Sequence, residues 1–178
     1  MIAAAEGHTA IVTALLNHRD GAFWEPSRDN KTHFAEAFVT AAERGFPDVI
    51  QSFLNFRIGG VSLQWCVADT LSYNPGRNGP IEGALERACT ALNQNRCAYA
   101  AGETRALSPE ESTSRWQAII TTLVRHMLAI DERVPWWTSC VIERAKGGTK
   151  VYINNLINGD YSGSPAAELM QTIVEESK

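Results

Sequence analysis

The sequence lacks a long apolar run, a secretion signal and a strong excess of charge of either sign. Across 178 residues, 16 Lys and Arg stand against 20 Asp and Glu, which gives a net charge of −4. Binding to nucleic acid or to an anionic membrane through bulk charge is therefore not expected. No apolar stretch approaches the roughly 18 residues of a membrane helix, and the N-terminal segment lacks a basic start. We expect an intracellular, cytoplasmic protein.

Metal-binding and redox motifs are also missing. The four cysteines are Cys66, Cys89, Cys97 and Cys140, and no two of them form a Cys-x-x-Cys pair. The four histidines do not fall at the spacings typical of zinc ligands. The sequence therefore predicts reduced thiols and no cofactor. With 44% apolar and 20% charged residues, the composition is that of a folded chain rather than a disordered one.

A repeated two-helix pattern is the main feature present, and its clearest copy spans residues 36–54. We expect a first helix that ends at Gly45, where glycine can adopt the positive φ of a helix C-cap. Pro47 suits the first turn of a second helix, because its missing N–H is not needed there. The predicted first helix buries Phe38, Ala41 and Ala42, and the second buries Val49, Ile50, Phe53 and Leu54.

Three other stretches show the same pattern. Residues 3–16 align with Gly7 on Gly45, which predicts that Ile11, Val12, Leu15 and Leu16 are buried. A third copy is split, with its first helix at 81–89 and its second at 116–124. A degenerate fourth copy spans 139–157, with Gly148 at the place of Gly45.

The run Ala-Ala-Glu-Gly-His-x-x-Ile-Val-x-x-Leu-Leu at residues 4–16 resembles the helical core of an ankyrin repeat. The Thr-Pro-Leu-His tetrapeptide of that family is absent. The resemblance implies an all-α, ankyrin-like solenoid of about four helix-turn-helix repeats with inserted segments and a C-terminal capping helix. The expected repeats are 1–22, 34–58, 81–128 and 137–160, the insertions 59–80 and 92–114, and the capping helix 164–176.

Within the insertions, two local elements are predicted. Residues 61–71 could form an extra helix. Ser108-Pro109-Glu110-Glu111 is typical of a helix start, with serine as the cap and acidic residues near the positive end of the helix dipole.

The resemblance implies a non-catalytic module that binds another protein through its concave face, turn fingers and insertions. The fingers are expected at 23–34, 74–80 and 133–138. The candidate binding residues are Trp24, His33, Trp65, Tyr73, Trp136 and Trp137. Tryptophan is enriched at binding hot spots, but Trp24, Trp136 and Trp137 could instead pack against neighbouring repeats, and both interpretations stay open.

The competing hypothesis is a small enzyme or ligand-binding protein with a pocket formed by the two insertions. Gly147-Gly148-Thr149-Lys150 lacks the residue order of a phosphate-binding loop, and no other catalytic motif is present. A site assembled from the insertions would draw on Cys66, Asp69, Tyr73, Cys97, Tyr99 and Glu103.

The first repeat has only six residues before Gly7, so its first helix is expected to be short. Three interpretations account for this: the chain is part of a larger repeat protein, its N-terminal end dimerises, or the C-terminal segment covers it. We favour the first.

Overall fold

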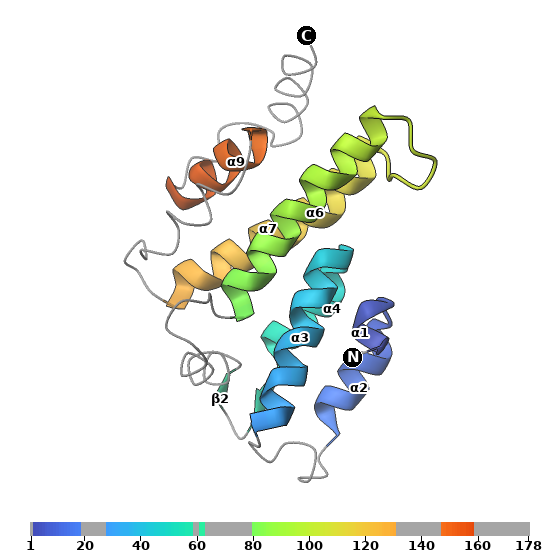
Figure 1. Ribbon diagram of the computed structural model, residues 1–178. Helices are drawn as coiled ribbons and strands as arrows, with labels where there is room; N and C mark the ends of the chain where they lie inside the picture. The colour runs from blue at the N-terminus through green and yellow to red at the C-terminus, as the bar shows by residue number, and fades with distance from the viewer. Residues whose placement is uncertain (1, 19–27, 59–60, 63–79, 131–146, 159–178) are drawn as a thin grey trace.

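The computed structural model describes residues 2–18, 28–58, 61–62, 80–130 and 147–158 (Figure 1). These ranges are helical apart from their connecting turns and two short strands, β1 (Arg57–Ile58) and β2 (Val61–Ser62), which pair antiparallel. The helices are α1 (Ile2–Ala5), α2 (Thr9–Asn17), α3 (Arg28–Arg44), α4 (Pro47–Asn55), α6 (Pro80–Ala100), α7 (Pro109–Ile130) and α9 (Gly147–Asn158). The predicted all-α class is confirmed in the described part, with this strand pair as the exception.

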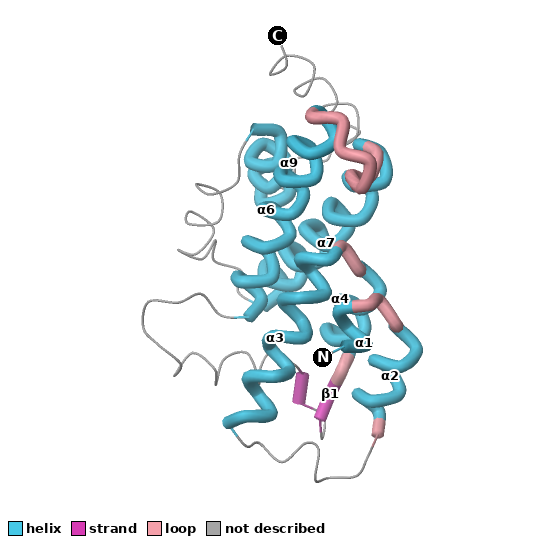
Figure 2. Tube along the Cα trace, turned by 45° about the vertical axis from the view of Figure 1, so that its right-hand side comes forward, coloured by secondary structure: helices cyan, strands magenta, loops and turns pink. Residues whose placement is uncertain are grey.

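Six of the helices form three antiparallel hairpins, α1–α2, α3–α4 and α6–α7, which follow one another along the molecule (Figures 1 and 2). The first helices lie in one row, because α3 packs on both α1 and α6. The second helices lie in another row, because α4 packs on both α2 and α7. Helix α9 then packs on α7.

Each hairpin turn uses a glycine in the left-handed region. Gly7, Gly45 and Gly102 have φ values of 74°, 78° and 77°. In each turn the residue after the glycine donates its N–H to a carbonyl five residues back, which is the Schellman arrangement. The pairs are His8 N to Ala3 O at 2.9 Å, Phe46 N to Ala41 O at 3.1 Å and Glu103 N to Ala98 O at 3.0 Å. The predicted helix ends at Gly7 and Gly45, and the predicted role of Pro47, are confirmed.

Small side chains bring the first helices together. Ala41 and Ala42 of α3 are fully buried, as are Ala84 and Ala88 of α6. The predicted stripe of α4 is buried as well. Close-packed alanines let two helix backbones approach, so that the larger core side chains fill the space beside them.

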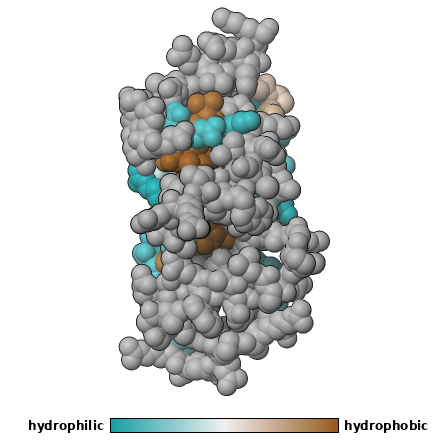
Figure 3. Space-filling view, turned by 90° about the vertical axis from the view of Figure 1, so that its left-hand side faces the viewer, coloured by the Kyte–Doolittle hydropathy of each residue, from teal (hydrophilic) through white to brown (hydrophobic). Residues whose placement is uncertain are grey.

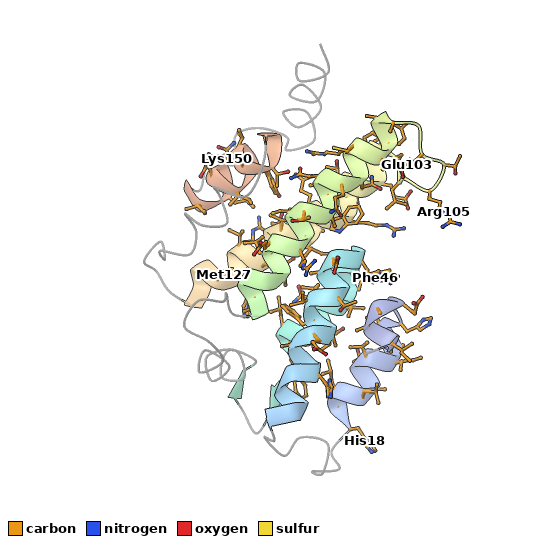
Figure 4. All side chains as sticks on the ribbon, in the orientation of Figure 1. His18, Phe46, Glu103, Arg105, Met127 and Lys150 are labelled. Carbon is orange, nitrogen blue, oxygen red and sulfur yellow. The ribbon has the colours of Figure 1, made fainter. Side chains whose placement is uncertain are left out.

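An aromatic side chain of each later hairpin packs on the glycine turn of the hairpin before it. A Cβ added to Gly7 would lie 2.6 Å from the ring of Phe46, and one added to Gly45 would lie 3.1 Å from the indole of Trp116. Figure 4 shows Phe46 between α4 and the α1–α2 hairpin. Trp116 also donates its Nε1–H to the backbone carbonyl of Glu43 at 3.2 Å. These contacts join consecutive hairpins.

The structure corrects four expectations from the sequence. Most of the expected insertion at 92–114 is helix, and only residues 101–108 connect α6 to α7. Gly148 lies inside α9 rather than at a turn. Residues 61–62 of the expected helix 61–71 form β2, and the expected finger at 23–34 is helical from Arg28 onward. Residues 74–79 of the expected finger 74–80 lie outside the described residues, as do the expected finger 133–138 and the capping helix 164–176. Pro80 is the first residue of α6.

Replacing the turn glycines separates backbone strain from steric conflict. Gly102→Ala should lower the free energy of unfolding by about 1–2 kcal/mol, the cost of a left-handed alanine, because its added Cβ meets nothing within 4 Å. Gly7→Ala should cost about 1–3 kcal/mol more, because the Phe46 ring must also move. Urea denaturation measures both values, and equal losses would contradict the close packing on Gly7.

Candidate interaction surfaces

Of the six binding residues predicted from the sequence, the structure describes one. His33 lies in the first half of α3 and is exposed, with its Nδ1 3.5 Å from Oε2 of Glu36. Trp24, Trp65, Tyr73, Trp136 and Trp137 lie outside the described residues. His33 is therefore placed on a helix surface rather than on a turn finger.

The row of first helices presents polar side chains of both charge signs. Arg87 of α6 and Glu43 of α3 form an ion pair at 3.6 Å, and both side chains are about half exposed. Such an exposed pair contributes at most about 1 kcal/mol to stability. Its charges remain accessible to solvent, so this surface offers hydrogen bonds and charge rather than apolar area to a partner.

The end of the α6–α7 hairpin forms a second surface, defined here as the hairpin tip, residues 99–108. Figure 4 shows Glu103 and Arg105 at the far end of this hairpin, and both are exposed. Asn95 of α6 restrains the loop between α6 and α7. Its side-chain Nδ2 donates to the Leu107 carbonyl at 3.0 Å, and its Oδ1 accepts from the Leu107 N–H at 2.9 Å. The tip is therefore restrained at Leu107 by these two hydrogen bonds.

Helix α7 begins as the sequence predicts. The Ser108 hydroxyl accepts a hydrogen bond from the Glu111 N–H at 3.2 Å, and Glu111 forms a 2.7 Å ion pair with Arg115. This N-cap restrains the end of the hairpin tip that leads into α7.

The third surface is the exposed side of α2. Ile11 is 51% exposed and Leu15 is 50% exposed, so the prediction that both are buried is wrong, whereas Val12 and Leu16 are buried as predicted. A shallow open depression of about 460 Å³ lies here, lined by Ala10, Ile11, Ala14, Leu15 and His18. Its lining is almost wholly apolar.

Apolar side chains also reach the surface near α9. Figure 3 views the molecule from the side of α9 and shows apolar next to polar surface in its upper part. Val151 of α9 is 49% exposed. On the inner side of α9, Tyr152 and Thr121 of α7 share a hydrogen bond between their hydroxyl groups. This hydrogen bond connects α9 to α7.

Three residues considered for a catalytic site, Cys97, Tyr99 and Glu103, are exposed at or beside the hairpin tip. They do not line the depression on α2. Cys89, in contrast, is buried in α6, and this burial, with a smaller contribution from the charge of Glu86, raises the pKa of its thiol to about 12. A thiol with such a pKa stays protonated near neutral pH and is a poor nucleophile.

Among the described residues, no group of three or more His, Cys, Asp and Glu side chains could hold a metal ion. Nor does this part of the chain contain a helix with the length and apolar character to cross a membrane. No protein-family model, no curated protein and no solved structure matches the chain.

Removing the Asn95 side chain should release the hairpin tip. Asn95→Ala leaves the Leu107 N–H and carbonyl without their partners, so the amide of Leu107 should exchange with deuterium faster and the free energy of unfolding should fall by about 1 kcal/mol. Gln94→Ala, on the exposed side of the same helix, should change stability by less than about 0.5 kcal/mol. Unchanged exchange at Leu107 in Asn95→Ala would disprove the restraint.

Burial of Cys89 should make stability depend on pH in the alkaline range. In the unfolded chain the thiol ionises near its ordinary pKa of 9.0, whereas in the folded chain it ionises near 12. The folded state therefore retains a proton that the unfolded state loses, and the free energy of unfolding falls as pH rises from about 9 to about 12. Between pH 9 and 10 this group accounts for a loss of about 1 kcal/mol.

Urea unfolding of the wild type and of Cys89→Ala at both pH values isolates this contribution, because all other groups titrate alike in the two proteins. The difference in stability between wild type and variant should shrink as pH rises. A pH-independent difference would contradict the burial of the thiol.

Proposed function

We propose that this chain is an ankyrin-like helical-repeat module that binds another protein and does not catalyse a reaction. The observation that carries the proposal is the two-row packing of three hairpins, in which α3 contacts both α1 and α6 while α4 contacts both α2 and α7. Stacked hairpins of this kind offer an extended surface formed by side chains from successive repeats.

The proposed contact surface combines the exposed side of α3 and α6 with the hairpin tip. His33, Glu43 and Arg87 are exposed there, and the tip adds the half-exposed ring of Tyr99. Because two hydrogen bonds from Asn95 already restrain Leu107 of the tip, binding would cost less conformational entropy at this residue. Exposed charges of both signs, together with a half-exposed aromatic ring, suit a polar protein surface rather than a small apolar ligand.

An intracellular, cytoplasmic setting belongs to the same proposal. Among the described residues, Cys89 and Cys97 are free thiols, which suits a reducing compartment.

Site-specific photo-crosslinking tests the proposal. A photoreactive residue at His33 or at Tyr99 should capture a protein partner at least about tenfold more than the same residue at Gln51, which is exposed on α4 in the other row. Capture should weaken when the charges of Glu43 and Arg87 are both reversed. Equal capture from both rows would contradict the proposed contact surface. A small molecule that raises the melting temperature, with no captured protein, would favour the pocket hypothesis instead.

A further inference from the structure

We draw no further inference here: the strongest candidate, the exposed Gly102 turn at the hairpin tip, has the same left-handed glycine as the turns on which Phe46 and Trp116 pack, but nothing in the structure shows what covers it.

Discussion

The packing of an aromatic ring on the glycine turn of the preceding hairpin is the contact on which the arrangement of helices depends. Glycine is needed at Gly7 and Gly45 for two reasons at once: a positive φ ends the first helix, and the absence of a Cβ makes room for Phe46 and Trp116. One glycine therefore determines both the turn and the place where the aromatic ring of the next hairpin packs. As a result, the hairpins follow one another in a fixed register and form the two rows of helices.

The parts of the fold that sequence reasoning predicted correctly are local. Gly45 followed by Pro47 marks a turn between two helices through backbone constraints alone, and the structure has that turn. The length of the third hairpin was missed because its Gly102 turn was not recognised, although small residues precede that glycine as they precede Gly45. The Asn95 bonds to Leu107 join residues twelve apart, and no short motif indicates such a pair.

The exposure of Ile11 and Leu15 shows a different limit of prediction from the sequence. An apolar stripe predicts which side of a helix avoids water, but it does not say which neighbour covers that side. The cover depends on the length of the antiparallel helix, which is long in α3 and short in α1. The candidate binding surfaces show the same limit of sequence-based prediction. The residue type of His33 makes it a candidate, but its position on a helix depends on where α3 begins.

The contact between rings and glycine turns is tested most directly by proton–proton nuclear Overhauser measurements on the full chain. The account predicts cross-peaks from the Trp116 indole to the Gly45 Hα protons and from the Phe46 ring to the Gly7 Hα protons, with these glycine resonances shifted upfield by the rings. Glycine Hα resonances at their random-coil positions, without cross-peaks to either aromatic side chain, would contradict it.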